Sequence, residues 1–317
     1  MDEVDEVDEV DGVDGRRDNG ETRCGYAAIV GRPNVGKSTL LNRLLGQKIS
    51  AVTAKPNTTR NRVLAVWTKG GAQIAFLDTP GVHRPRGSLG RYMLDAAVQA
   101  IAETDVVVWI LDAAAGGAGA LGEEEREVAE RLVGAGKPIV ALLNKIDLIR
   151  DKAALLPMLA AAGEIQGVAA AIPISALADD GIDRFLDVVV PLLPAGPHLY
   201  PEEMISDRAD RFFVAELVRE ALMELTRDEV PYKTAVVVER FVEEERRCVV
   251  NAAIHVEKDS QKGIVIGKAG RMRGEIRARA RAEAEKLLGV PVDLRLHVRV
   301  TPGWTESPTG LRKMGYE

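Results

Sequence analysis

Residues 31–38 read Gly-Arg-Pro-Asn-Val-Gly-Lys-Ser, which fits the phosphate-binding loop pattern G-x-x-x-x-G-K-[ST]. An apolar run over 27–30 predicts a buried strand before the loop, and the apolar spacing over 39–45 predicts a helix after it. In such a loop successive backbone N–H groups turn inward toward phosphate oxygens, and the helix N-terminus adds partial positive charge. Because strand, loop and helix follow in this order, a chance glycine-containing turn is the weaker interpretation. The feature predicts an α/β fold with a nucleotide site.

Each position of this loop has an expected task at a nucleotide. Lys37 can reach the β- and γ-phosphates, and the Ser38 hydroxyl can complete a Mg²⁺ shell. The glycines let the backbone curl tightly, because they have no Cβ atom. We therefore expect the nucleotide to be bound by the loop residues Gly31, Asn34, Val35, Gly36, Lys37, Ser38 and Thr39.

The net charge of −6 conceals two opposite ends. Residues 1–20 carry nine Asp and Glu against two Arg, whereas residues 258–317 carry 13 Lys and Arg against seven Asp and Glu. So few apolar residues and so many like charges predict that an acidic tail, residues 1–22, is disordered. The tail is either a solvated appendage or a competitor of RNA for the basic end.

The remaining composition favours a soluble protein of the reducing cytoplasm. Cys24 and Cys248 lie far apart and without metal-ligand spacing, so two buried thiols are the expected state. No apolar run approaches the roughly 18 residues that span a bilayer, and the acidic N-terminus is unlike a signal peptide.

From residue 23 to residue 193, strand-like apolar runs alternate with helix-like segments, which predicts a doubly wound, mostly parallel sheet. Runs over 63–68 and 73–77 flank two glycines and indicate a hairpin. The other expected strands are 106–111, 138–143 and 172–174, the last near a sheet edge because it contains proline. Helical periodicity is found over 92–102, 123–133, 152–161 and 182–190.

Repeated prolines after residue 190 predict a linker over 194–206, which leaves residues 207–317 as a second, α+β domain. Its expected order is α-β-β-α-α-β. The elements that we expect are a helix at 207–225, strands at 234–241 and 248–256, helices at 261–266 and 271–288, and a strand at 291–300.

Three further motifs follow predicted strands, at the edge where open α/β sheets bind ligands. Asp78-Thr79-Pro80-Gly81 offers a carboxylate for Mg²⁺ and the Gly81 N–H for a γ-phosphate. In Asn144-Lys145-Ile146-Asp147, the carboxylate can accept from two donors of guanine that adenine does not match, and the Lys145 stem can lie along the base. Ser175-Ala176 can offer backbone N–H groups to the guanine carbonyl oxygen. Each motif alone fits a loop or helix cap, but together they predict a guanine nucleotide.

This series of motifs resembles the translation-factor-related GTPases, whose first switch carries a magnesium-binding threonine. By that resemblance Thr59 is the expected ligand, with Thr58 as the alternative, and it would join Ser38 and Asp78. Farther on, residues 265–270 match the V-I-G-x-x-G loop of type II KH domains. A single GTPase domain before a KH domain resembles the Era family of bacterial GTPases over about residues 24–316, and three short motifs agree: Pro231-Tyr232, Glu239-Arg240-Phe241 and Gly303-Trp304.

The resemblance implies a GTPase that binds GTP and GDP with Mg²⁺, binds the 3′ end of 16S ribosomal RNA and assists maturation of the 30S ribosomal subunit. It also implies peripheral contact with the inner face of the cell membrane, for which the sequence has no clear amphipathic signature. We expect a monomer.

The residues around the KH loop suit a single-stranded RNA chain. A G-x-x-G loop lets its backbone approach the sugar–phosphate chain, and basic side chains follow it on one helix, where residues 273 and 277 share a face. A solvated basic face is the alternative. The expected RNA contacts are Gly267, Lys268, Ala269, Gly270, Arg271, Arg273 and Arg277.

Residue 82 bears on the hydrolysis step, because many GTPases have a glutamine there to orient the attacking water. Val82 cannot hydrogen-bond a water, and the neighbouring His83 is more simply incidental. We expect slow hydrolysis that an outside group completes. Related GTPases with a hydrophobic residue here hold K⁺ through an asparagine of the phosphate loop, which implies K⁺-stimulated hydrolysis through Asn34. The expected catalytic residues are Lys37, Thr59, Gly81 and Asn34.

Two other functions stay open at this point. The first is an RNA-binding adaptor with a degenerate GTPase domain, against which the intact Lys37, Ser38, Thr59 and Asp78 argue. The second is a tRNA-modifying GTPase, against which the domain order argues, because those proteins have extra domains and lack a KH domain.

Overall fold

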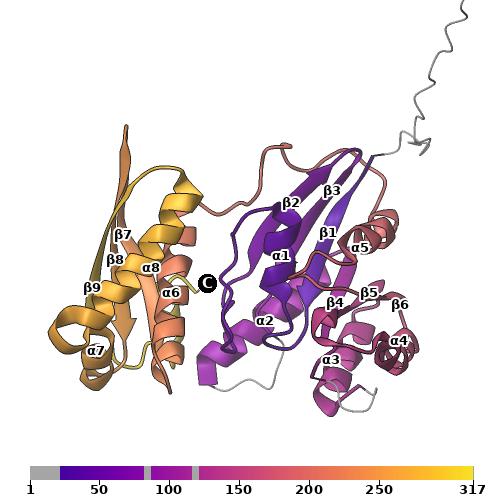
Figure 1. The fold of residues 1–317 in the computed structure, drawn as a ribbon, viewed down its shortest axis with the longest axis horizontal. Helices are drawn as coiled ribbons and strands as arrows, with labels where there is room; N and C mark the ends of the chain where they lie inside the picture. Colours follow the sequence, from indigo (N-terminus) through magenta and orange to yellow (C-terminus); the bar gives the residue numbers. More distant parts are fainter. Residues whose placement is uncertain (1–21, 82–86, 116–120, 317) are drawn as a thin grey trace, which may run out of the picture.

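The computed structural model describes residues 22–81, 87–115 and 121–316, and Figure 1 shows its two halves side by side. Residues 1–21 of the acidic tail, and also Val82 and His83, lie outside the described residues, so the predictions made for them stay predictions. Within the described ranges, no helix is both long enough and apolar enough to cross a membrane.

A six-stranded sheet in the order β2-β3-β1-β4-β5-β6 forms the first half. Only β2 runs antiparallel, in the predicted hairpin with β3, and the remaining neighbours are parallel. β6 is an edge strand, as its proline predicted. The bounds are β1 Arg23–Val30, β2 Val63–Lys69, β3 Ala72–Asp78, β4 Val106–Asp112, β5 Ile139–Asn144 and β6 Val168–Pro173.

Helices cover both faces of this sheet, which confirms the doubly wound fold (Figure 1). Ala27 and Ile29 of β1 face the core shared with α1 and α5, while Ala28 and Val30 face the core shared with α2, α3 and α4. Burial on both sides is why these strands read as continuous apolar runs. The helices are α1 Lys37–Leu45, α2 Gly87–Glu103, α3 Glu123–Gly134, α4 Leu156–Gly163 and α5 Ile182–Val189.

The stretch expected as a linker, 194–206, is bonded to the first half along much of its length. Buried Gln73 of β3 accepts from the N–H groups of Leu199 and Tyr200 at 2.8 and 2.9 Å. Farther along, the Val66 N–H of β2 donates to the Ile205 carbonyl at 2.8 Å. The chain therefore follows the sheet before it enters the second half.

The second half has the predicted order α-β-β-α-α-β, with a three-stranded sheet β7-β8-β9. α6 and α8 share its core with the sheet through residues such as Val218 and Ile276. Cys248 in this core and Cys24 in β1 are both free and buried, as predicted. The elements are α6 Asp210–Leu225, β7 Thr234–Glu244, β8 Arg247–Val256, α7 Asp259–Ile266, α8 Arg271–Leu288 and β9 Val292–Val300.

A C-terminal segment that the sequence analysis did not predict follows β9 and contains α9 (Pro308–Lys313). Its Trp304 and Tyr316 are buried and pack against Leu89 and Tyr92 of α2. The segment therefore connects the second half to a helix of the first half.

Candidate nucleotide site and nucleic-acid interface

The phosphate-binding loop lies between β1 and α1, and a side chain from the end of β5 shapes it. Asn144 donates through Nδ2 to the Val35 carbonyl at 2.8 Å and accepts through Oδ1 from the Ala176 N–H at 2.9 Å. At Gly36 the φ angle is 104°, and a Cβ atom there would lie 2.1 Å from Asn144 Nδ2. Glycine is thus required at this position by the backbone and by its neighbour.

Lys37 is almost fully buried beneath the phosphate-binding loop. Its Nζ donates to the carbonyls of Gly31 and Arg32 at 3.1 and 2.8 Å. Burial lowers the pKa of Lys37 to about 8, although the nearby charge of Asp78 opposes the shift. A phosphate would supply the negative charge that favours the protonated lysine.

Three oxygen-bearing side chains converge beside Lys37, as predicted for a magnesium site. Asp78 Oδ2 lies 3.1 Å from Ser38 Oγ and 3.5 Å from Thr59 Oγ1, and the two hydroxyl oxygens are 3.1 Å apart. The second carboxylate oxygen of Asp78, Oδ1, is buried and has no hydrogen bond within the described part of the chain. Burial also raises the Asp78 pKa, against the effect of Lys37. A divalent cation with oxygen ligands would satisfy this cluster.

The two candidate threonines are distinguished by their contacts. Thr59 faces Ser38 and Asp78, whereas Thr58 Oγ1 bonds to the Lys55 carbonyl at 2.9 Å and to Thr53 Oγ1 at 2.7 Å. The geometry therefore favours Thr59 as the ligand. Nowhere in the described ranges do three His, Cys, Asp or Glu side chains form a metal-binding group.

The predicted guanine-binding residues lie together at the ends of β5 and β6. Asp147 Oδ1 accepts from Ser175 Oγ at 2.6 Å, which orients its exposed carboxylate. Lys145 pairs with Asp112 at 2.5 Å, a contact that the sequence analysis missed although Asp112 ends a strand of the same sheet. The Ala176 N–H, expected at the guanine carbonyl, donates to Asn144 here.

Asn34 and Gly81 occupy the side of the loop that faces the first switch. Here we define the switch segment as residues 52–60. Asn34 Nδ2 donates to the Ala54 carbonyl of this segment at 2.8 Å. A Cβ atom on Gly81 would lie 2.9 Å from the Pro33 nitrogen, so the backbone that follows β3 approaches the loop closely.

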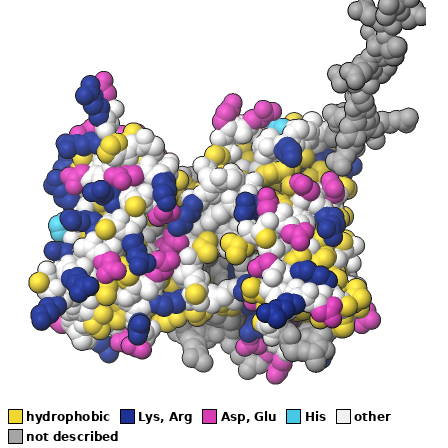
Figure 2. Space-filling view, viewed as in Figure 1, with side chains coloured by type: hydrophobic (Ala, Val, Ile, Leu, Met, Phe, Trp, Pro, Cys, Tyr) yellow, Lys and Arg dark blue, Asp and Glu magenta, His cyan; other side chains and the backbone are white. Residues whose placement is uncertain are grey.

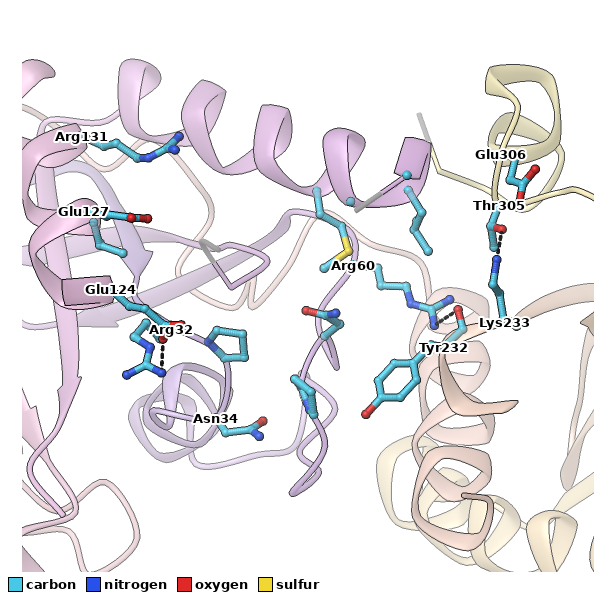
Figure 3. Close-up of a pocket in the computed structure, with 18 of the residues that line it drawn as sticks. Arg32, Asn34, Arg60, Glu124, Glu127, Arg131, Tyr232, Lys233, Thr305 and Glu306 are labelled. Carbon is cyan, nitrogen blue, oxygen red and sulfur yellow. Dashed lines mark hydrogen bonds and ion pairs between the residues drawn. The ribbon is translucent and has the colours of Figure 1, made fainter. Parts of the chain in front are cut away.

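A cavity of about 1040 Å³ opens between the loop and the second half of the molecule. In Figure 3, Arg32 and Asn34 of the loop and Glu124 of α3 lie on one side, while Tyr232 and Lys233 lie on the other. Arg60 extends from the switch segment toward Tyr232 (Figure 3). The phosphate side of the nucleotide site therefore faces the second half.

The predicted RNA-binding loop connects α7 to α8 through a 3₁₀ turn, η5 (Lys268–Gly270). Gly267 has a φ angle of 70°, and a Cβ there would lie 2.9 Å from the Met272 nitrogen. Ala269 also has positive φ, 52°, in a region that alanine rarely adopts. The tight backbone leaves Lys268 exposed beside the N-terminus of α8.

Basic side chains are plentiful on this half of the molecule, the left lobe in Figure 2, but acidic side chains lie among them. Within the described ranges, the basic residues of α8 that form ion pairs are later ones, such as Arg279, which pairs with Glu275, and Lys286, which pairs with Glu283. Arg271, Arg273 and Arg277, nearer the loop, are exposed. The part of α8 next to the loop is thus the better surface for a phosphate backbone.

Two families match the chain, one in each half. Residues 26–145 match the family described as 50S ribosome-binding GTPase, and residues 229–305 match the KH domain. Among curated proteins, the GTPase Era of Geotalea uraniireducens is 46% identical over 296 residues, which cover 93% of this chain and 98% of that protein. The GTPase Era of Staphylococcus haemolyticus is 41% identical over 297 residues, 93% of this chain and 98% of the relative.

Two solved structures share both halves of the fold. One is a tyrosine-to-alanine variant of Aquifex aeolicus Era bound to GDP and AlF4⁻, and the other is Era in complex with MgGDPNP and nucleotides 1506–1542 of 16S ribosomal RNA. Each is 39% identical to this chain, with a TM-score of 0.88, and the match covers 93% of this chain and 99% of the solved one. The likeness extends over both halves of the chain.

Proposed function

This chain belongs to the Era family of GTPases, and from that premise we propose that it binds the 3′ end of 16S ribosomal RNA in its GTP-bound state and assists maturation of the 30S ribosomal subunit. We divide the chain into an acidic tail (1–22), a G domain (23–193), a linker (194–206) and a KH domain (207–317). The solved relative that contains both MgGDPNP and a 16S fragment supports this proposal.

The observation that carries the proposal is the contact between the switch segment of the candidate nucleotide site and the KH domain. The switch segment, which includes the candidate magnesium ligand Thr59, is bonded to the domain that includes the RNA-binding loop. Arg60 donates to the carbonyl of Thr234 in the KH domain at 2.7 Å. A change in the switch segment on GTP hydrolysis would therefore act on the KH domain directly.

At the nucleotide site we assign binding of the phosphates to Lys37 and the loop N–H groups. Ser38, Thr59 and Asp78 would hold Mg²⁺, which neutralises charge on the phosphates when it is bound. The Gly81 N–H would donate to the γ-phosphate, because the backbone at Gly81 approaches the phosphate loop at Pro33 closely. Asp147, oriented by Ser175, would select guanine.

Fluorescence anisotropy tests the proposal with an RNA that copies the 3′ end of 16S ribosomal RNA and a scrambled control. Binding is measured with GDP and with a non-hydrolysable GTP analogue, over a salt series because phosphate contacts are salt-dependent. We expect preference for the native RNA and tighter binding with the analogue. Equal, weak binding of both RNAs in both nucleotide states would overturn the proposal.

We also propose that K⁺ takes part in hydrolysis through Asn34, whose amide already bridges the phosphate loop and the switch segment. Hydrolysis by the wild-type protein should be several times faster in K⁺ than in Na⁺ at equal ionic strength. In Asn34→Ala the two rates should converge, because the side-chain oxygen is lost. Equal wild-type rates in the two salts would contradict this role.

A further inference from the structure

The KH domain contacts the switch segment along most of its length, beginning at the N-terminal end. Glu220 of α6 is buried and accepts from the Val52 N–H at 3.1 Å. Lys48, just before the segment, pairs with the same carboxylate at 2.8 Å and with Glu283 of α8 at 3.4 Å. Two helices of the KH domain thus meet the start of the segment.

In the middle of the segment, Lys55 extends to the C-terminal end of α6. Its Nζ donates to the carbonyls of Met223 and Thr226. The last carbonyls of a helix have no partners within the helix and carry partial negative charge, so a lysine there is favourable. The segment therefore serves as a cap for the helix on which it lies.

The closest contacts flank Thr59. On one side, the Thr58 carbonyl accepts from Arg219 of α6, whose guanidinium is 1% exposed and also pairs with Glu216. On the other side, the Arg60 guanidinium, also 1% exposed, is surrounded by KH-domain oxygens. Its partners are the carbonyls of Pro231 (3.0 Å), Tyr232 (3.3 Å) and Thr234 (2.7 Å), and the hydroxyl of Tyr316 (3.0 Å).

These contacts restrict the orientation of the Thr59 side chain. The residues before and after it are bonded to the KH domain, so its hydroxyl points to the opposite side, toward Ser38 and Asp78. Arginine suits this positioning role because its planar guanidinium has several N–H donors and can bond to several buried carbonyls at once. The orientation of the candidate magnesium ligand thus depends on contacts that the KH domain makes with its two neighbours in the chain.

We propose that Arg219 and Arg60 are positioning residues for Thr59, and that the docked KH domain thereby completes the Mg²⁺–GTP site of the G domain. The inference rests on the proposed assignment of Thr59 as a magnesium ligand. It implies that Arg219 selectively favours the triphosphate state, because the switch threonine responds to the γ-phosphate and its Mg²⁺. GDP, which lacks the γ-phosphate, would bind without help from Arg219.

The test compares the affinities of fluorescent GDP and a fluorescent, non-hydrolysable GTP analogue for the full-length wild-type protein and Arg219→Ala. With saturating Mg²⁺, the variant should bind the analogue on the order of tenfold more weakly, within the range of measured couplings between sites. GDP affinity should stay within about twofold. Arg211→Ala is the matched control, because Arg211 is exposed on the same helix. Arg219→Lys, which retains a positive charge and N–H donors but not the planar guanidinium, should restore part of the difference.

Equal losses for GDP and the analogue, or no loss for either, would overturn the inference. Removing Arg219 leaves Glu216 without its partner, so Lys55→Met provides a second variant that changes only the G-domain side of the contact. It should weaken analogue binding in the same selective way. The proposed function is tested separately by wild-type RNA binding, so RNA binding that ignores the nucleotide would reject that function and not the role of Arg219.

Discussion

Asn144 connects the phosphate loop to the loop on the guanine side of the candidate nucleotide site. Its amide bonds to the phosphate loop at Val35 and to the guanine-side loop at Ala176, and it occupies the space next to Gly36. From the sequence, this asparagine belongs to the motif 144–147, which is predicted to bind the guanine base. Its contacts show that it also bonds to the backbone of the phosphate-binding loop.

Gly36→Ala should abolish nucleotide binding, because the new Cβ would lie 2.1 Å from Asn144 Nδ2 and push the two loops apart. We expect the affinity for GDP to fall by more than about 100-fold, as displacements of about 1 Å in a site can cause. Gly46→Ala is the control, since Gly46 also has positive φ but no atom within 4 Å of its Cβ position. It should lower stability by about 1 kcal/mol and leave GDP affinity unchanged. Comparable affinities for the two variants would show that the contact with Asn144 is unimportant.

Nucleotide affinity should depend on pH through Lys37, whose pKa is lowered by burial to about 8. The phosphates need the protonated lysine, so the neutral form that accumulates as pH rises through this value binds more weakly. Without Mg²⁺, GDP affinity should therefore fall by about tenfold between about pH 7 and about pH 9. Lys37→Arg remains charged over this range and should remove the slope. A wild-type affinity that stays constant would contradict the lowered pKa.

At the scale of elements, the strands of the first half were predictable and the environment of α6 was not. The strands are buried on both faces, so their apolar runs are visible in the sequence. The polar face of α6 predicts exposure to solvent, yet Arg219 and Glu220 are buried against the switch segment. The sequence signal for this burial was Met223, an apolar residue on the same face of α6, which the structure shows to be fully buried.

The switch segment gives a prediction that separates its two threonines. Thr59→Ala should slow Mg²⁺-dependent GTP hydrolysis by at least about tenfold, about 1.4 kcal/mol of the barrier, because it removes an oxygen from the candidate metal cluster. Thr58→Ala removes only contacts within the segment, to Thr53 and Lys55, and should have a smaller effect. Single-turnover phosphate release measures both, and a larger loss in Thr58→Ala would reverse the assignment.

At the scale of the whole molecule, two separate regions of the KH half contact the G domain, one at the switch segment and one at α2. α6 and the turn η4 (Val230–Tyr232) contact the switch segment, while the C-terminal segment contacts α2, which follows the Asp78–Gly81 motif. Tyr316 takes part in both, because its hydroxyl accepts from Arg60 and its ring centroid lies 6.0 Å from that of Tyr92. The G and KH domains are therefore connected at the switch segment, which contains the candidate magnesium ligand Thr59, and at α2.

The limits of prediction from sequence follow from this arrangement. Motifs such as the phosphate loop and G-x-x-G are local, and their chemistry can be derived from a few adjacent residues. Contacts between domains join residues far apart in the chain, such as Arg60 with Tyr316, and have no periodic pattern. Buried arginines at a domain boundary look like ordinary surface charges until the fold is known.

The measurement that tests the account most directly is the effect of RNA on nucleotide affinity. Coupling between two sites is reciprocal. RNA that copies the 16S 3′ end should therefore raise the affinity for the GTP analogue relative to GDP, by the same factor by which RNA binds more tightly with the analogue than with GDP. We expect a factor of about 5 to 150 in the wild-type protein and a factor near one in Arg219→Ala. Wild-type nucleotide affinities that do not change with saturating RNA would contradict the claim that RNA binding by the KH domain is coupled to the GTP-bound state.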